Sequence, residues 1–234
     1  MTGQIHSIQT LGATDGPGVR FTIFTSGCPL RCACCHNPDT WEQGGTETDA
    51  SELIKKAERY REYFGDTGGI TVSGGEPLMQ AGFVTEIFKL AKEKGINTCL
   101  DTSGCVLNDE VKALLEVTDL VMLDIKYTTA EDYRKYVGCE FSLVLEFLEY
   151  LQRAGKRTWI RQVIIPGLND NEDNIVRLRD LIRSNSVVEK AELLPFKKLC
   201  EVKYENLGLE FPLKDTPEPK PQQMAELRVK LNSN

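Results

Sequence analysis

Three cysteines near the N-terminus have the spacing of ligands to a cubic iron–sulfur cluster. Cys28, Cys32 and Cys35 follow the pattern C-x3-C-x2-C, and Cys34 lies directly beside Cys35. A structural zinc site usually needs two pairs of Cys or His ligands, and no second pair follows here. An electron-transfer ferredoxin supplies four thiolates to each cluster. Because adjacent cysteines direct their side chains differently, the pattern favours three thiolates on a [4Fe-4S] cluster, whose fourth iron is open for chemistry.

Further polar groups follow other β-branched runs of the chain. Gly74 and Gly75 lack a Cβ, so their backbone can approach a ligand closely. Asp101 and Asp124 end neighbouring predicted strands, where their carboxylates repel unless a cation or a ligand ammonium lies between them. Lys126 could offset a ligand carboxylate. The alternatives are that the aspartates cap the following helices, that Lys126 is a solvated charge, and that these are ordinary turns.

Six predicted strand-and-helix units position these groups. The strands are 20–26, 70–73, 97–101, 120–126, 158–165 and 191–196. Apolar residues at helical spacing predict helices between them, and Asp49 with Glu52 forms a capping-box pattern. Such alternation implies parallel pairing with right-handed crossovers. We therefore expect an α/β fold, a single-domain partial (β/α)6 barrel over residues 1–234, with functional groups at the carboxyl ends of its strands. A proline-rich strap (211–221) should precede a C-terminal helix.

Composition favours a globular protein. Of the 234 residues, 41% are hydrophobic and 27% charged. Lys plus Arg number 28 against 35 Asp plus Glu, a net charge of −7, which disfavours a nucleic-acid partner. The N-terminus lacks signal-peptide features, and no apolar run approaches the roughly 18 residues of a membrane span. We expect a cytoplasmic protein without membrane contact. Its eight cysteines should be thiols or metal ligands rather than disulfides.

Longer motifs surround the candidate residues. They are residues 15–20, 35–41, 72–77, 99–102, 119–126 and 159–161, in this order along the chain. Together with the cysteine spacing, they resemble the radical S-adenosylmethionine (SAM) superfamily. Within it they are similar to the activases of glycyl-radical enzymes, and most of all to those that activate pyruvate formate-lyase. The resemblance runs from about residue 5 to the strand at 193–195.

The resemblance implies an oxidoreductase with one [4Fe-4S] cluster, held by Cys28, Cys32 and Cys35, and SAM as cosubstrate on the open iron. An electron from reduced flavodoxin or ferredoxin would cleave SAM to methionine and a 5′-deoxyadenosyl radical. That radical would take a hydrogen atom from a glycine Cα of pyruvate formate-lyase. The hard chemistry belongs to the cofactors, and no further catalytic residue is implied.

The resemblance also implies ligand contacts. Those with SAM are Cys34, Cys35, His36, Gly75, Asp124, Ile125, Lys126 and Lys197. A monovalent-cation site beside the SAM carboxylate would comprise Asp101, Thr102, Met122 and Asp124. Asp15 would help to seat the glycine loop of the partner.

Two positions depart from the family pattern. Cys34 stands where an aromatic residue usually lies near the adenine, and it either fills that role or competes as a ligand. Lys197 stands in place of a histidine close to the adenosyl group. The alternatives are an activase of another glycyl-radical enzyme (a 2-ketobutyrate formate-lyase or a dehydratase) or a non-catalytic iron–sulfur or zinc protein. The last would leave the Gly-Gly turn and the strand-end aspartates without a purpose.

Overall fold

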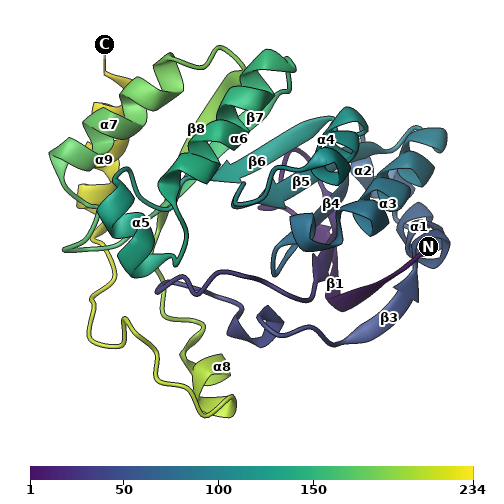
Figure 1. Ribbon diagram of the computed structural model, residues 1–234, viewed down its shortest axis with the longest axis horizontal. Coiled ribbons are helices and arrows are strands. Elements are labelled where there is room, and N and C mark those ends of the chain that lie inside the picture. Colours follow the sequence, from purple (N-terminus) through teal and green to yellow (C-terminus); the bar gives the residue numbers. More distant parts are fainter. Residues whose placement is uncertain (234) are drawn as a thin grey trace. The chain divides into compact units, whose positions relative to one another are not determined.

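A computed structural model describes residues 1–233 as an α/β fold, as predicted (Figure 1). Its strands are β1 (Thr2–Gly12), β2 (Arg20–Thr25), β3 (Thr46–Asp49), β4 (Gly69–Gly74), β5 (Asn97–Thr102), β6 (Leu120–Asp124), β7 (Thr158–Ile164) and β8 (Val188–Pro195). Within the described residues they form one open sheet in the order β3-β1-β2-β4-β5-β6-β7-β8. The open, largely parallel sheet agrees with the predicted partial barrel.

The helices occupy most of the segments between the strands. They are α1 (Ala50–Glu58), α2 (Arg61–Phe64), α3 (Ala81–Glu93), α4 (Asp109–Glu116), α5 (Ala130–Tyr136), α6 (Phe141–Arg153), α7 (Glu172–Arg183), α8 (Glu201–Asn206) and α9 (Pro221–Asn232), with single 3-10 turns at Pro38–Thr40 and Pro77–Gln80. None of these helices, among residues 1–233, combines the length and the apolar character needed to cross a bilayer.

Contacts between residues divide the chain into two compact units. The first comprises residues 1–29 and 40–122, and the second comprises 30–39 and the chain from 123 onward. The organisation as one domain therefore stays a prediction.

The first unit contains the strands that the apolar pattern does not predict. β1 pairs antiparallel with both β2 and β3, whereas β2, β4 and β5 pair parallel. Most side chains of β1 are exposed, so its sequence lacks the alternation of a half-buried strand. Hydrogen bonds to its neighbours, rather than burial, hold it in the sheet. Helices α1, α3 and α4 lie side by side in this unit (Figure 1).

Of the predicted capping box, the N-cap bond of Asp49 is present, to Ser51 rather than to Glu52. Asp49 is the N-cap of α1, and its carboxylate accepts a hydrogen bond of 2.8 Å from the Ser51 backbone N–H. This satisfies one of the N–H groups that a helix start leaves unpaired. The helix ends at Glu58, and Phe64 lies in the separate short helix α2.

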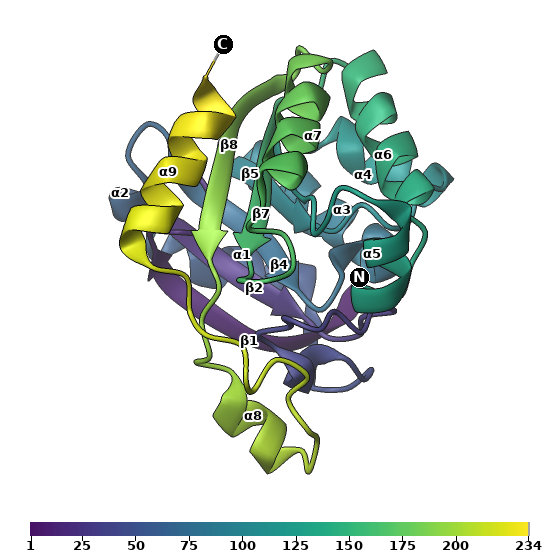
Figure 2. The ribbon, with the colours of Figure 1, turned by 90° about the vertical axis from the view of Figure 1, so that its left-hand side faces the viewer.

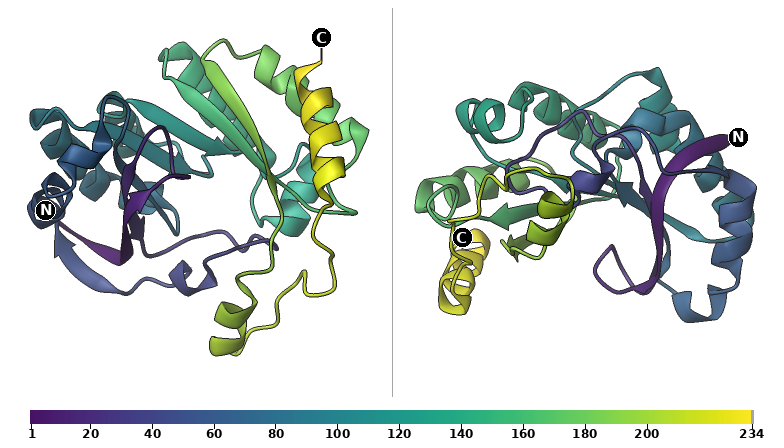
Figure 3. Two further views of the ribbon diagram at one scale, coloured as in Figure 1. Left: turned by 180° about the vertical axis from the view of Figure 1, so that it is seen from behind. Right: turned by 90° about the horizontal axis from the view of Figure 1, so that it is seen from below.

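The second unit contains β7 and β8, which pair parallel. Helices α7 and α9 pack against each other and on β8 (Figures 2 and 3). Residues 211–220 connect α8 to α9 without a helix or strand. Phe211 is buried there against Tyr204, with ring centroids 4.9 Å apart, so this proline-rich strap is anchored by an aromatic contact.

Asp119, just before β6, supports the start of that strand. Its carboxylate accepts hydrogen bonds from the backbone N–H and the hydroxyl of Thr98, at 3.0 and 3.1 Å, and pairs with Lys92. Burial alone would raise the pKa of Asp119, but Lys92 and Thr98 outweigh it and lower the pKa. We expect Asp119→Asn to lower the free energy of unfolding at pH 7 by about 1–3 kcal/mol, the cost of unpaired partners.

This difference should depend on pH. Because the folded pKa is depressed, the ionised Asp119 stabilises the fold fully above the unfolded pKa, roughly 4, and this contribution is lost as pH falls through the lower folded value. Asp109→Asn is the control, since Asp109 is 98% exposed and pairs with neighbouring Lys112 at the surface; its effect should stay within about 0.5 kcal/mol. Urea unfolding at pH 7 and pH 3 measures both. Equal losses in the two variants would contradict the assigned role.

Candidate functional site

The cysteine loop is fixed to the end of α5 within the second unit. In segment 30–39, the Arg31 N–H donates to the Val137 carbonyl at 3.1 Å, and the Ala33 N–H donates to the Tyr136 carbonyl at 2.8 Å. Both acceptors lie at or just beyond the C-terminus of α5, where carbonyls have no partner within the helix. The loop therefore has a defined backbone although it contains no α-helix or strand.

The three cysteines of this segment differ in exposure. Cys32 and Cys35 are partly exposed, whereas Cys34 is buried, and burial raises the pKa of Cys34 to about 11. The Cys35 N–H donates to the Cys32 carbonyl at 3.0 Å, and the Tyr204 hydroxyl donates to the Cys35 carbonyl at 3.3 Å. None of the eight cysteines is joined in a disulfide in the structure.

Cys28 belongs to the first unit. Its N–H donates to the Trp41 carbonyl at 3.0 Å, and the N–H of Gly27 donates to the Thr40 carbonyl at 2.9 Å. Cys28 borders a cavity of about 370 Å³. The lining residues are Gly27, Cys28, Pro29, Trp41, Glu42, Gln43 and Met79.

The Gly-Gly turn follows β4 in the same unit. A Cβ on Gly75 would lie 2.3 Å from the Gly27 carbonyl oxygen, and one on Gly74 would lie 2.3 Å from the Thr25 nitrogen. Gly74 also has φ of +113°, which side chains disfavour. The two glycines are thus required by the packing of the chain on itself, a reason beyond the predicted approach of a ligand.

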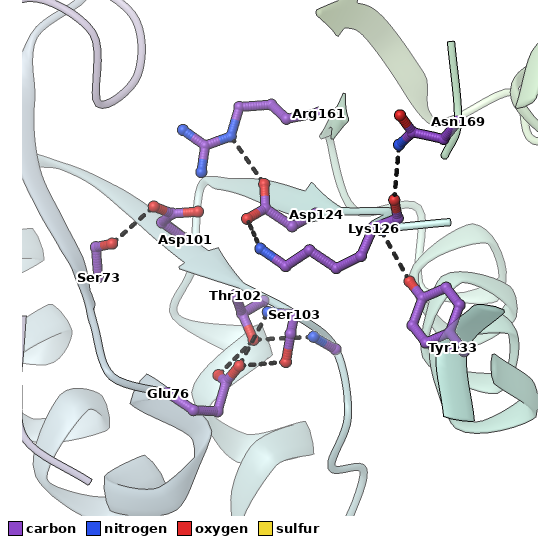
Figure 4. Close-up of polar contacts among 11 residues, drawn as sticks. Ser73, Glu76, Asp101, Thr102, Ser103, Asp124, Lys126, Tyr133, Arg161 and Asn169 are labelled. Carbon is purple, nitrogen blue, oxygen red and sulfur yellow. Dashed lines mark hydrogen bonds and ion pairs between the residues drawn. The ribbon is translucent and has the colours of Figure 1, made fainter. Parts of the chain in front are cut away.

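Glu76 links this turn to the end of β5 (Figure 4). Its buried carboxylate accepts hydrogen bonds from the Thr102 hydroxyl (2.5 Å), from the N–H (2.9 Å) and hydroxyl of Ser103, and from the Leu78 N–H (3.2 Å). Burial raises the pKa of Glu76, although these hydrogen bonds oppose the shift. The sequence prediction gave Glu76 no role. A glutamate in an otherwise apolar turn, with Thr-Ser after the next strand, is the signal that could have found it.

The predicted cation ligands of the first unit have other partners as well. Asp101 accepts a hydrogen bond of 2.7 Å from the Ser73 hydroxyl. The Thr102 hydroxyl donates to Glu76 and accepts the Gly104 N–H at 3.1 Å. Met122 is fully buried. Among residues 1–233 no three His, Cys, Asp or Glu side chains are grouped as ligands of a single metal ion. The cation site stays a prediction.

Asp124 lies between two cations of the second unit (Figure 4). Its carboxylate is 2.5 Å from Lys126 Nζ and 3.1 Å from Arg161 Nε. Burial alone would raise the pKa of Asp124, but these cations lower it. Burial alone would likewise lower the pKa of Lys126, but Asp124 raises it well above its usual value. The ion pair therefore stays charged at neutral pH. Arg161 lies in a motif noted in the sequence, but its role in this pair was not predicted.

Comparison with known proteins identifies the family. Residues 22–179 match the radical SAM superfamily. The chain is 45% identical over 215 residues to the pyruvate formate-lyase-activating enzyme of Clostridium pasteurianum, covering 91% of this chain and 90% of the relative. It is 42% identical over 230 residues to the pyruvate formate-lyase 1-activating enzyme of Escherichia coli K12, covering 97% and 94%. The chain belongs to the pyruvate formate-lyase-activating enzymes of the radical SAM superfamily.

A solved structure supports the fold of this radical SAM protein. A domain of a pyruvate-formate lyase-activating enzyme from Bacteroides vulgatus superposes with a TM-score of 0.59 at 22% identity. The match covers 70% of this chain and 92% of that domain.

Membership in the superfamily implies a [4Fe-4S] cluster and SAM as cofactors. The residues present fit the cluster, because thiolate sulfur is the usual ligand of iron–sulfur clusters. Cys32 and Cys35 are accessible on a loop of fixed backbone, and Cys28 borders a cavity. Cys34 is buried, whereas these three cysteines are partly exposed.

Two further predicted SAM contacts of this radical SAM protein lie in the second unit. His36 Nε2 is 3.0 Å from the Lys197 carbonyl oxygen, so Lys197 meets the cysteine loop through its backbone. Its side chain instead pairs with Glu218 of the strap at 2.6 Å. A direct contact of Lys197 Nζ with the adenosyl group would require this exposed pair to open.

Asp15 is held by two threonines in the first unit. The Thr22 hydroxyl donates to its carboxylate at 3.1 Å, and the Thr71 hydroxyl donates to its backbone carbonyl at 2.6 Å. Asp15 is half-buried, in a loop where Gly16 and Gly18 have positive φ angles. The predicted partner contact thus lies on a fixed rather than a loose turn.

Proposed function

We propose that this protein activates a pyruvate formate-lyase by forming a glycyl radical on it. The similarity to curated activases of that name, over about nine-tenths of both chains, is the observation that carries the proposal. Reductive cleavage of SAM at the cluster supplies methionine and a 5′-deoxyadenosyl radical, which abstracts the glycine Cα hydrogen. The protein binds and orients these groups and keeps water away.

The cluster is assigned to three residues of the N-terminal loop. Cys28, Cys32 and Cys35 supply the thiolates, and Cys34 stays off the cluster because its side chain is buried. The backbone of residues 34–36 contacts SAM from the same loop. The Cys35 N–H donates to the Cys32 carbonyl and its carbonyl accepts the Tyr204 hydroxyl, so the backbone of this residue is held in place for that contact.

We assign the amino-acid end of SAM to residues at the carboxyl ends of β4 and β6. Gly75 contributes backbone from the first unit. Asp124, Ile125 and Lys126 contribute from the second, where the Lys126 ammonium offsets the SAM carboxylate. By the family resemblance, Asp101, Thr102, Met122 and Asp124 would hold a monovalent cation beside the SAM carboxylate. Lys197 is the least supported contact, since its ammonium is paired with Glu218.

The partners follow from the same proposal. Pyruvate formate-lyase is the substrate, with Asp15 helping to seat its glycine loop, and reduced flavodoxin or ferredoxin is the electron donor. Neither a nucleic acid nor a membrane takes part, in keeping with the net charge of −7. The cytoplasm, where thiols stay reduced, is the expected compartment.

Two experiments test the proposal in sequence. Anaerobic reconstitution with iron and sulfide, reduction with dithionite and addition of SAM should yield methionine and 5′-deoxyadenosine. Failure to form either product would rule out the radical SAM reaction. Addition of pyruvate formate-lyase should then produce a glycyl-radical doublet in the EPR spectrum. A doublet obtained only with a 2-ketobutyrate formate-lyase or a glycyl-radical dehydratase would assign a different partner.

A further inference from the structure

Lys126 has both polar groups of its backbone bonded to side chains from other elements. It lies two residues beyond the end of β6. Its N–H donates to the Tyr133 hydroxyl at 3.0 Å, and its carbonyl accepts from Asn169 Nδ2 at 3.3 Å (Figure 4). Tyr133 lies in α5, and Asn169 lies in the loop between β7 and α7. Both partners belong to the second unit, as does Lys126.

The tyrosine is itself held in place. Tyr133 is only 1% exposed, and its ring stacks on that of Phe141 with centroids 4.6 Å apart. Burial raises the pKa of Tyr133, so the hydroxyl is neutral at physiological pH. Its oxygen is therefore a fixed acceptor for the Lys126 N–H.

The asparagine is fixed by bonds on both sides of its amide. Asn169 is 2% exposed. Its Oδ1 accepts the Ile165 N–H at 2.7 Å, and its Nδ2 also donates to the Val163 carbonyl at 2.8 Å. These bonds define which end of the amide faces Lys126.

The position of this peptide sets the direction of the Lys126 side chain. The Lys126 ammonium pairs with Asp124, and the Ile125 N–H donates to the Arg161 carbonyl at 2.9 Å. A buried N–H that loses its acceptor is costly to keep in place, so the segment would shift without Tyr133. Small displacements of a binding group are enough to weaken a site.

We propose that Tyr133 and Asn169 are positioning residues for SAM: they clamp the Lys126 peptide and thereby aim the Lys126 ammonium and the Asp124 carboxylate. The inference rests on the proposed function, which gives these two charges their ligand. Neither Tyr133 nor Asn169 contacts the ligand in this role. Their effect passes through the backbone of residues 124–126.

A matched pair of tyrosine variants tests the clamp. Tyr133→Phe removes one hydroxyl and keeps the ring. Tyr127→Phe is the control, because Tyr127 is equally buried, at 1% exposure, and its hydroxyl has no hydrogen-bond partner among the described residues. Hydrogen exchange, followed by mass spectrometry on the cluster-free protein, should be about tenfold faster at residues 125–127 in Tyr133→Phe. It should be unchanged in Tyr127→Phe.

SAM cleavage with dithionite as reductant gives the second measurement. In the reconstituted protein, Tyr133→Phe should raise the KM for SAM by about tenfold and change kcat by less than about twofold, as expected for lost positioning. Tyr127→Phe should match the wild type. Asn169→Asp, which replaces the donor facing the Lys126 carbonyl by an acceptor, should raise the KM in the same direction.

The outcomes separate the two ideas. If the wild type does not cleave SAM, the proposed function fails, while the exchange comparison still tests the clamp. If Tyr133→Phe and Tyr127→Phe behave alike in exchange, or if active Tyr133→Phe keeps the wild-type KM, the positioning role is overturned. Thermal unfolding of each variant, compared with the wild type, checks that the substitution leaves the protein folded.

Discussion

Replacing Cys28, Cys32 or Cys35 by alanine is expected to abolish cluster binding and to reduce SAM cleavage to the rate seen without protein, whereas Cys34→Ala keeps both. Three thiolates hold a cluster with one open iron, so the loss of any one leaves two protein ligands. Cys32 and Cys35 are partly exposed on a loop fixed by backbone hydrogen bonds. Cys34 is only 8% exposed and acts as a small buried side chain.

Iron and sulfide content after anaerobic reconstitution, with the visible absorption of the cluster, measures this directly. Methionine and 5′-deoxyadenosine are then quantified with dithionite and SAM. Cys200→Ala is a second control, because Cys200 is buried at the start of α8 and lies outside the cysteine motif. A cluster that survives in Cys35→Ala but is lost in Cys34→Ala would move the ligand register by one residue.

Arg20→Met is expected to lower the free energy of unfolding by about 3 kcal/mol or more, because each buried acceptor left without its donor costs about 1–3 kcal/mol. Arg20 is fully buried in the first unit. Its guanidinium donates to the Thr71 hydroxyl (2.9 Å), to the Asn97 side-chain oxygen (3.0 Å), and to the carbonyls of Ile70 (2.5 Å) and Thr67 (3.3 Å). Burial lowers the pKa of Arg20, although nearby Cys99, Asp119 and Asp15 oppose the shift.

The expected loss comes from the acceptors rather than from the arginine alone. Methionine fills part of the volume but leaves buried carbonyl oxygens without donors, and each such group is costly. Arg20→Lys should recover little, because an ammonium cannot reproduce the planar fork of five N–H donors. The same side chain donates to the Pro17 carbonyl at 3.5 Å, so the loop that carries Asp15 should loosen as well.

Urea unfolding at neutral pH measures the loss, and Arg157→Met is the matched control. The Arg157 side chain is 57% exposed and pairs with Glu189 at the surface. A pair of this kind contributes at most about 1 kcal/mol. Similar losses of unfolding free energy in the two variants would show that the hydrogen bonds of Arg20 do not stabilise the first unit.

Local patterns predicted much of this fold. Asp49 caps α1 through a contact only two residues along the chain, and the apolar spacing of α3, α4, α6 and α7 repeats within each helix. The ends of the parallel strands were predicted to within three residues, and the largest error falls at the start of β8, where the side chains are mostly exposed or only half-buried. Strands β1 and β3 escaped prediction, since β1 is held by hydrogen bonds to distant residues and exposes most of its side chains.

The sequence by itself indicated the kind of chemistry, because the C-x3-C-x2-C spacing within eight residues predicts cluster ligands without reference to the rest of the chain. Only the tertiary structure decided how the neighbouring groups are supported. Gly75 is required by the carbonyl of Gly27, 48 residues away along the chain, and the Lys126 peptide is held by Tyr133 and Asn169. Such contacts join residues from different elements, and the chain must fold before any spacing reveals them.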